Sequence, residues 1–338
     1  MDQERYSRQI LFHGIGCSGQ DALMKSCVAI VGCGALGSVT ATYLARAGVG
    51  KIVIVDRDFV ELNNLQRQIL FDEEDAEQRK PKALAAAEKL GRANSTIQVQ
   101  PIIADLYPGN AFELLGDADL IIDGTDNVET RYLINDTCLK LGIPWIYAGV
   151  IGSEGMTMSI IPGKTACFRC LLPEPPPPGS LPTCDTAGVL GAAVGVVSSF
   201  QACQAMKILT GHEIDNSILL VLDAWEGRFY TIRIDPNTDC PACTKGQFEF
   251  LQGTGFSEAF SLCGRNAVQI RPTRAAKLDL TRLRQQLAPL GKVVDHKFFI
   301  SFTAGDYELI IFPEGRVMIK GTTDEGIARG LYAKYVGT

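Results

Sequence analysis

The sequence predicts an α/β protein with a doubly wound, Rossmann-like parallel sheet that is extended by antiparallel strands and followed by a small C-terminal α+β domain. Three observations carry this prediction. An apolar run leads into a glycine-rich turn at residues 27–37, strand and helix patterns alternate from there to residue 150, and the pattern changes after Gly152. Buried parallel strands have this continuous apolar character, and their alternation with helices is typical of βαβ units.

The parallel half of the sheet is expected to begin at CVAIVG, residues 27–32, and its first helix at residues 35–47. A helical leader at residues 1–25 precedes them. Each strand is short and apolar, as expected where both faces of a sheet are covered by helices. Further strands are expected at KIVIVD, ending at Asp56, and near residues 97–103, 119–123 and 145–150, and further helices at residues 81–90 and 128–141.

The antiparallel extension is expected after Gly152, where GMTMSII alternates between polar and apolar residues. A crossover loop at residues 171–185 contains four consecutive prolines, which exclude helix and central strand. The apolar stretch at residues 186–206 approaches the length that spans a bilayer, but it includes serines and glutamines and has no aromatic belt. We therefore expect a core or dimer-interface helix and no membrane span, followed by strands at residues 218–222 and 229–234.

Three parts follow from these patterns. Residues 1–245 form the domain that carries all the chemical motifs, residues 246–259 form a polar linker, and residues 260–338 form the small α+β domain. The pattern of this last part is strand, helix, three strands and helix, and it contains no chemical motif.

The composition favours proteins or small molecules as partners. The formal net charge is −6 and the pI is near 5.3, which gives no long-range attraction to nucleic acid or to an anionic membrane. The first ten residues are charged and do not resemble a signal peptide, which favours the cytoplasm. Four of the 11 cysteines form two CxxC pairs, so thiol chemistry or metal binding is expected rather than disulfides.

A nucleotide site is expected at GCGALG, because this motif follows a strand and opens a helix. Its glycines let the backbone approach phosphates at the helix N-terminus. Asp56 lies nineteen residues beyond Gly37, where an acidic residue accepts hydrogen bonds from ribose hydroxyls. The motif alone does not distinguish NAD from ATP. The expected binding residues here are Gly32, Gly34, Ala35, Gly37 and Asp56.

Several further motifs occur in a fixed order: RYSRQI, GCGALG, DRDFVELNNLQRQ, KPK, GTDN and the two CxxC pairs. Over residues 4–245 the chain thereby resembles the ThiF/MoeB-type adenylyltransferases, which are similar to the adenylation domain of ubiquitin-activating enzymes. The resemblance implies ATP-dependent adenylation of the C-terminal Gly-Gly carboxylate of a small ubiquitin-like sulfur-carrier protein, for thiamine or molybdenum-cofactor biosynthesis. It also implies a homodimer, and a separate protein is expected to donate the sulfur.

The chemistry of this reaction explains the charged residues in the motifs. A C-terminal carboxylate has a pKa of about 3.5 and is ionised at neutral pH, so no general base is needed. The obstacle is the approach of one anion to another, which cations aimed at the triphosphate relieve. The resemblance implies that Arg8, Arg67 and Lys82 are catalytic cations and that Asp126 binds Mg²⁺. Asn64 and Asn127 are expected near the nucleotide.

The cysteines divide into a metal site and a reactive thiol. Cys167, Cys170, Cys240 and Cys243 form two pairs with the spacing of zinc knuckles, and four thiolates leave no open position on Zn²⁺, so the site would be structural. Two unrelated pairs, or a redox pair, are the alternatives. Cys184, in LPTCDTAG, matches the family's cysteine that bonds covalently to the carrier.

Two other functions are compatible with the glycine motif. An NAD(P)-dependent oxidoreductase needs a proton relay near its substrate, but none of the three histidines lies beside a strand end of the sheet core. A non-catalytic scaffold that binds a ubiquitin-like protein would not need Arg67, Lys82 and Asp126. Adenylation therefore accounts for more of the sequence than either alternative.

Overall fold

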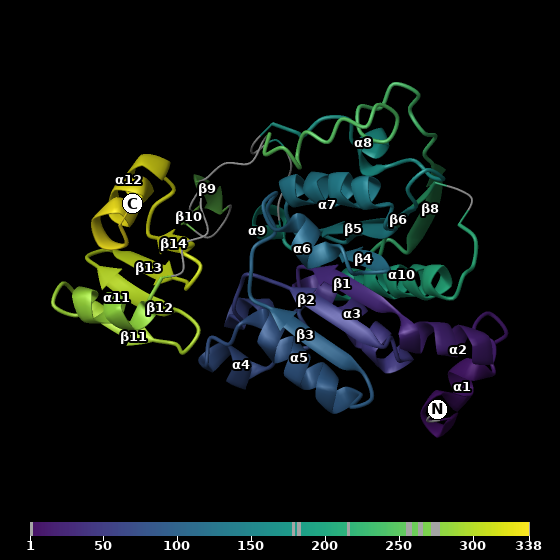
Figure 1. Ribbon diagram of the computed structural model, residues 1–338, viewed down its shortest axis with the longest axis horizontal. Helices are drawn as coiled ribbons and strands as arrows, with labels where there is room; N and C mark the ends of the chain where they lie inside the picture. Colours follow the sequence, from purple (N-terminus) through teal and green to yellow (C-terminus); the bar gives the residue numbers. More distant parts are fainter. Residues whose placement is uncertain are drawn as a thin grey trace. The chain divides into compact units, whose positions relative to one another are not determined.

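The computed structural model describes residues 3–177, 180, 184–214, 217–254, 259–262, 266–271 and 278–337. The chain divides into two compact units, Met1–Gly255 and Phe256–Thr338 (Figure 1). The predicted fold class is confirmed, because each unit contains the expected kind of sheet.

The first unit is built on an eight-stranded sheet with the order β3-β2-β1-β4-β5-β6-β7-β8. Strands β1 to β5 form the parallel part of the sheet, and β6 to β8 are added to β5 by antiparallel pairing, so the parallel sheet is extended at one edge, as the sequence predicts. The strands are β1 (Cys27–Val31), β2 (Lys51–Val55), β3 (Gln98–Ile102), β4 (Leu120–Asp123), β5 (Trp145–Ile151), β6 (Glu154–Ile160), β7 (Ile218–Asp223) and β8 (Arg228–Arg233).

Helices cover both faces of this sheet. Helices α3, α5 and α10 lie on one face and α6 and α7 on the other (Figure 1). The helices of this unit are α1 (Gln3–Ile10), α2 (Gly16–Lys25), α3 (Ala35–Ala47), α4 (Glu73–Glu77), α5 (Lys82–Ala93), α6 (Ala111–Leu115), α7 (Val128–Leu141), α8 (Phe168–Leu171), α9 (Cys184–Ala187) and α10 (Gly191–Leu209), with a 3₁₀ helix η1 at Leu62–Asn64.

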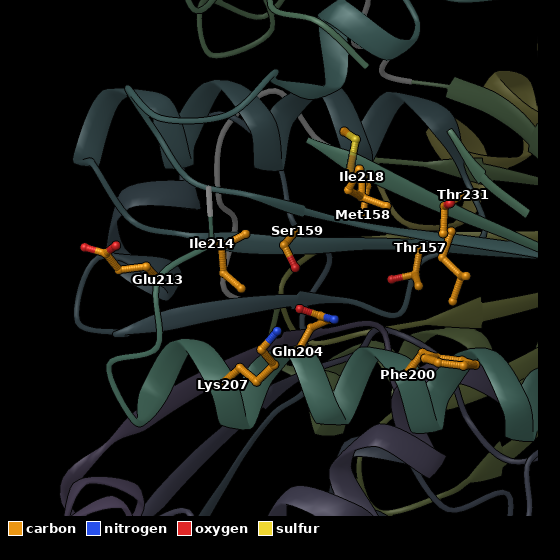
Figure 2. A pocket seen from close by; sticks show the side chains of 11 residues that line it. Thr157, Met158, Ser159, Phe200, Gln204, Lys207, Glu213, Ile214, Ile218 and Thr231 are labelled. Atoms are coloured by element: carbon orange, nitrogen blue, oxygen red, sulfur yellow. The ribbon is translucent and has the colours of Figure 1, made fainter. Parts of the chain in front are cut away.

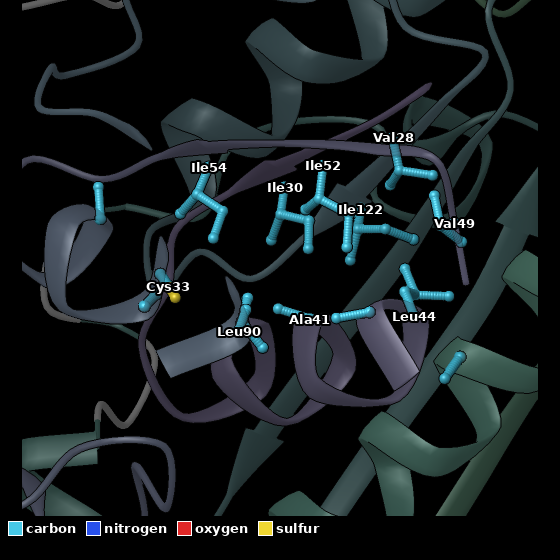
Figure 3. Close-up of a cluster of buried hydrophobic side chains, with 14 of the residues drawn as sticks. Val28, Ile30, Cys33, Ala41, Leu44, Val49, Ile52, Ile54, Leu90 and Ile122 are labelled. Carbon is cyan, nitrogen blue, oxygen red and sulfur yellow. The ribbon is translucent and has the colours of Figure 1, made fainter. Parts of the chain in front are cut away.

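The core of the first unit lies between the sheet and α3, α5 and α10. Figure 3 shows Ile30, Ile52 and Ile54 projecting from neighbouring strands onto Ala41 and Leu44 of α3, and all five side chains are fully buried. Burial of this apolar surface is the main favourable term in folding. Strand β1, which leads into the glycine turn, therefore lies in the core of the first unit.

Among the described helices, α10 alone is long and apolar enough to cross a bilayer by length and composition. Its packing identifies it as a core helix instead. The Gln201 amide lies inside the fold, where its nitrogen donates to the carbonyl oxygens of Asp123 and Ile146 at 2.8 and 3.1 Å. Its oxygen accepts from the Thr40 hydroxyl at 2.7 Å, so α10 is joined to α3, β4 and β5.

The N-terminal leader is helical, as the sequence predicts, and consists of two helices. Two helices, α1 and α2, are separated by a turn at residues 11–15. Gly16, the first residue of α2, adopts a positive φ of 61°, which does not continue a right-handed helix, so α1 and α2 are separate helices.

The second unit has a six-stranded antiparallel sheet with the order β11-β12-β13-β14-β10-β9. Two of these strands, β9 and β11, were not predicted. Phe302, Leu309 and Ile319 lie in its core, where Leu283 and Leu287 of α11 pack against them. Its elements are β9 (Ala259–Leu262), β10 (Ala267–Ile270), α11 (Leu280–Leu287), β11 (Lys292–Asp295), β12 (Ile300–Ala304), β13 (Tyr307–Ile311), β14 (Val317–Lys320) and α12 (Glu325–Tyr335).

Candidate active site

The glycine turn between β1 and α3 brings three stretches of backbone into close contact. Gly32 has a φ of 84°, which L side chains rarely adopt. A Cβ on Gly37 would lie 1.9 Å from the carbonyl oxygen of Gly32, and a Cβ on Gly124 would lie 2.2 Å from the same oxygen. Glycine is required at these three positions by packing alone, before any ligand is considered.

Gly34 is different, because space opens in front of it. The nearest atom to a Cβ on Gly34 would be Nε2 of Gln68, at 3.8 Å. Gly34 caps the N-terminus of α3, and the N–H groups of the first helical turn, including that of Ala35, have no acceptor within the helix. This combination of free N–H groups, helix dipole and open space suits a phosphate.

Two buried side-chain oxygens near this turn accept no hydrogen bond from the described residues. Asn64 is 2% exposed and Gln68 is 4% exposed, and the side-chain oxygens of both have no hydrogen-bond partner among the described residues. A buried unpaired acceptor costs free energy, so these atoms call for a donor from a ligand or water. Nucleotide hydroxyl and amino groups are such donors. Asn64 was predicted as a site residue, whereas Gln68 was missed although it stands in the same NNLQRQ motif.

Asp56 ties the end of β2 to the glycine turn. Its carboxylate oxygens accept from the backbone N–H of Cys33 at 2.6 Å and from that of Asp58 at 2.7 Å. Burial raises the pKa of Asp56, while the charge of Lys82 and these two hydrogen bonds oppose the shift. The carboxylate of Asp56, which is predicted to contact the ribose, therefore also holds the glycine turn in place.

Two of the predicted cations lie in the connection between β2 and β3, which leaves the carboxyl edge of the sheet. Lys82 opens α5 and is 3% exposed, and its Nζ lies 3.5 Å from a carboxylate oxygen of Asp58. Arg67 is half-buried, and its guanidinium donates to the carbonyl oxygen of Asn63 at 2.9 Å. Asp58 was not predicted, and its position beside Lys82 identifies it as the group that orients the ammonium.

Asp126 lies in the loop after β4 and is exposed, whereas Thr125 before it is buried and held by several hydrogen bonds. The backbone N–H and the hydroxyl of Thr125 both donate to Asp123, at 2.9 and 2.6 Å. Arg131 donates to the carbonyl oxygen of Thr125 at 2.8 Å and pairs with Asp123 at 3.0 Å. Asn127 caps α7 by accepting from the N–H of Thr130, so its predicted nucleotide contact would have to use its amide nitrogen.

The buried pair beneath this loop was also missed. Burial raises the pKa of Asp123, although Arg131 opposes the shift. Burial would lower the pKa of Arg131, yet the carboxylates of Asp123 and Asp126 raise it. Inside the fold, Asp123 and Arg131 together hold Thr125 at three atoms and thereby set where Asp126 projects.

Arg8 does not join these residues. On the same helix, the Tyr6 hydroxyl accepts from the Asn94 side chain at 2.8 Å, and Asn94 lies between α5 and β3. Helix α1 thus lies at the edge where the parallel strands begin, about 15 Å from the glycine turn, the length of a five-residue strand. Arg8 is exposed, and Cys184, the remaining predicted catalytic residue, has a side chain that lies outside the described residues.

The four predicted zinc ligands come together. The sulfur–sulfur distances are 3.8 Å for Cys167–Cys170, 3.6 Å for Cys167–Cys240 and 3.5 Å for Cys170–Cys243, and all four atoms lie within 4.8 Å of one another. A tetrahedron with Zn–S bonds of 2.3 Å has sulfur–sulfur edges of about 3.8 Å, whereas a disulfide bond is about 2.05 Å long. The geometry is consistent with zinc and excludes a disulfide in this cluster.

The Cys₄ cluster joins distant parts of the first unit. Cys167 lies at the N-terminus of α8 and Cys170 within that helix, and Cys240 and Cys243 follow β8. The backbone N–H of Asn237 donates to the Cys170 sulfur at 3.4 Å, as expected for a thiolate ligand with an outer hydrogen bond. Bound Zn²⁺ would be structural here, because the four sulfurs leave no open position for a substrate.

The sequence profile of the ThiF family matches residues 6–242. The chain belongs to the ThiF family. The sulfur carrier protein ThiS adenylyltransferase of Bacillus subtilis is 42% identical over 336 residues, which cover 98% of this chain and 99% of that protein. The SAMP-activating enzyme E1 of Haloferax volcanii is 39% identical over 261 residues, or 77% of this chain and 95% of that protein.

A solved structure shares the fold of this ThiF-family chain. The crystal structure of E. coli MccB with ATP has a TM-score of 0.62 at 24% identity, and the match covers 71% of this chain and 74% of that one. At this identity the likeness concerns the fold alone. The match to the Bacillus subtilis protein extends over nearly the whole chain and so includes the second unit, which lies beyond the ThiF-family region.

Replacing Cys240 with serine should remove bound zinc and loosen the first unit. We expect one zinc per chain in the unaltered protein by elemental analysis, and none in Cys240→Ser. A loss of about 3 kcal/mol would lower the unfolding midpoint by roughly 6–12 °C. Cys203→Ser, at an exposed position on α10, is the control and should retain zinc and the midpoint. Native protein without zinc would contradict the assignment.

Proposed function

We propose that this protein uses ATP to adenylate the C-terminal carboxylate of a small ubiquitin-like sulfur-carrier protein. One observation carries the proposal. The glycine turn lies at the carboxyl edge of the parallel sheet, where Arg67 and Lys82 come from the connection between β2 and β3 and Asp126 comes from the loop after β4. Ligands of open α/β sheets bind at this edge, and the named relatives of this chain are a carrier-protein adenylyltransferase and an E1 activating enzyme.

The reaction forms one bond and breaks one. A carboxylate oxygen of the carrier attacks the α-phosphorus of ATP, the bond to the β-phosphate oxygen breaks, and pyrophosphate leaves. Negative charge accumulates on the phosphates, so the work of the protein is to place cations there and exclude water. In our proposal the N-terminus of α3 and Lys82 hold the phosphates, Arg67 stabilises the developing charge, and Asp126 binds the Mg²⁺ that neutralises the triphosphate.

The carrier would be a protein ending in Gly-Gly. The Bacillus subtilis relative is named for the carrier ThiS and matches nearly the full length of this chain, which favours a ThiS-like carrier and thiamine biosynthesis over molybdenum-cofactor biosynthesis. The nine cysteines whose side chains the structure describes are free, and a four-thiolate metal site is stable under reducing conditions, which supports the cytoplasm as the compartment. Cys184 would then receive the activated carrier, and a separate protein would supply the sulfur.

Labelled pyrophosphate should exchange into ATP only when a Gly-Gly carrier is present, because the carrier carboxylate is the attacking group. A carrier whose C-terminus is blocked as the amide is the matched control and should give no exchange above background. Exchange without a carrier would show that the nucleophile is not the carrier carboxylate. Hydride transfer with NAD, in place of any exchange, would support the oxidoreductase alternative.

We also propose that the active unit is a homodimer in which Arg8 serves the partner's site. Two features support this. Arg8 lies at the edge of the sheet opposite to its own glycine turn, and α10 carries no charged residue before Lys207 although Ala192 and Cys203 are exposed. A helix that is apolar all round is normally covered, and a second copy would cover this one.

Mixing two inactive variants tests the shared site. Removal of a cation aimed at phosphate charge typically lowers the rate about 100-fold or more, so Arg8→Ala and Asp126→Ala should each be nearly inactive in pyrophosphate exchange. In a mixed dimer one site has both residues intact, and activity should return in part. Arg5→Ala, on the same helix, is the control and should remain active. If activity does not return after subunit exchange has been demonstrated, Arg8 does not act on the partner.

A further inference from the structure

A cavity of about 370 Å³ lies between the second half of α10 and strands β6 to β8 (Figure 2). It is separate from the nucleotide site. Helix α10 begins beside Arg67, where a Cβ on Gly191 would lie 3.5 Å from the Cα of Arg67, whereas the cavity is lined by Gln204 and Lys207 three to four turns further along. Strand β6 runs antiparallel to β5, so Ser159 near its end lies at the edge where the parallel strands begin.

The wall formed by the sheet contains an unsatisfied polar group. Ser159 is 7% exposed, and its hydroxyl oxygen is buried without a hydrogen-bond partner in the part of the chain that the structure describes. Figure 2 shows this hydroxyl directed from β6 toward α10. A buried hydroxyl without a partner costs free energy, so it requires a polar group inside the cavity.

The wall formed by α10 presents donors to the same space. In Figure 2 the amide of Gln204 and the ammonium of Lys207 rise from the helix toward Ser159. Lys207 makes no ion pair with any residue in the described part of the chain. Glu213 is the acidic residue among the described lining residues, and its carboxylate points away from the space between helix and sheet. An ammonium, an amide and a hydroxyl that converge in this way match an anion.

The rest of the lining is apolar. Met158, Ile218 and Leu220 come from the sheet, and Phe200 comes from α10. Phe200 and Ile218 are 37% and 38% exposed, so a ligand could still cover apolar surface here. The volume lies within the range of small-molecule sites, which is roughly 300–1,000 Å³, and such sites pair apolar walls with a few placed polar groups.

We propose that this cavity binds a small organic carboxylate, with the carboxylate between Lys207, Gln204 and Ser159 and an aliphatic or aromatic portion against Phe200, Ile218 and Leu220. Nothing in this proposal depends on the adenylation chemistry. The cavity uses none of the residues assigned to the nucleotide, and its ligand would bind whether or not ATP is present.

Ligand-observed NMR titrations with hexanoate, hexan-1-ol and hexylamine test this proposal on the full-length protein. These probes share an apolar chain and differ in the charge of the head group. We expect hexanoate to bind in the millimolar range, as a ligand of few atoms does, and the alcohol and the amine to bind at least about fivefold more weakly. Lys207→Met should weaken hexanoate about tenfold and leave hexan-1-ol unchanged, since a charge-assisted hydrogen bond is lost.

Two further variants keep the test specific. Ser159→Ala should weaken hexanoate about threefold or more, because one of its hydrogen bonds is lost. Lys164→Met, at an exposed lysine in the loop after β6, should bind hexanoate as the unaltered protein does. Equal binding of hexanoate and hexylamine, undiminished binding by Lys207→Met, or no binding of hexanoate at about 50 mM would overturn the proposal. So would dissociation of an oligomer by Lys207→Met, which would identify the cavity as part of a contact between chains.

Discussion

The carbonyl oxygen of Gly32 lies against the backbones of Gly37 and Gly124, and the candidate site depends on this contact. A single Cβ at either of the last two positions would approach the oxygen to about 2 Å, so the strand ends of β1 and β4 can meet only without side chains. The contact fixes the N-terminus of α3 next to the loop that carries Asp126. Packing thus brings together the groups that a triphosphate requires, and Gly34 remains open to receive it.

The charged side chains at the carboxyl edge of the sheet are positioned by oppositely charged neighbours that are largely buried. Asp58 lies beside Lys82, and the Asp123–Arg131 pair holds the residue before Asp126. Removal of one partner from a buried pair leaves an unpaired charge, which costs far more than the pair contributes to stability. These pairs are therefore better understood as a means of preorganising the cations and the carboxylate than as a source of stability. The Cys₄ cluster likewise fixes a position in the fold, because it joins α8 to the segment after β8.

The parallel sheet and the cysteine cluster were predictable because each leaves a local signal, namely short apolar runs between helices and CxxC spacing. Strand β11 was missed because its four residues include a lysine and an aspartate and it lies at an exposed edge of the second sheet. The role of the Asp123–Arg131 pair was missed because it depends on tertiary contacts. One of them joins Arg131 to the carbonyl oxygen of Ala148, seventeen residues further along the chain on β5. No sequence pattern reveals the cavity beside α10, because Ser159 lies more than forty residues before Gln204 and Lys207 and is distinguished only by the absence of a partner among the described residues.

Calorimetric titration of ATP into Gly34→Ala tests most directly whether the glycine turn is the nucleotide site. The new Cβ meets no protein atom closer than 3.8 Å, so the variant should fold and unfold as the unaltered protein does. It would project into the space assigned to the phosphates, and we expect ATP affinity to fall at least about tenfold, which corresponds to 1.4 kcal/mol. Gly91→Ala, in α5 with open space around it, should bind ATP normally. A folded Gly34→Ala variant that binds ATP as tightly as the unaltered protein would contradict the account.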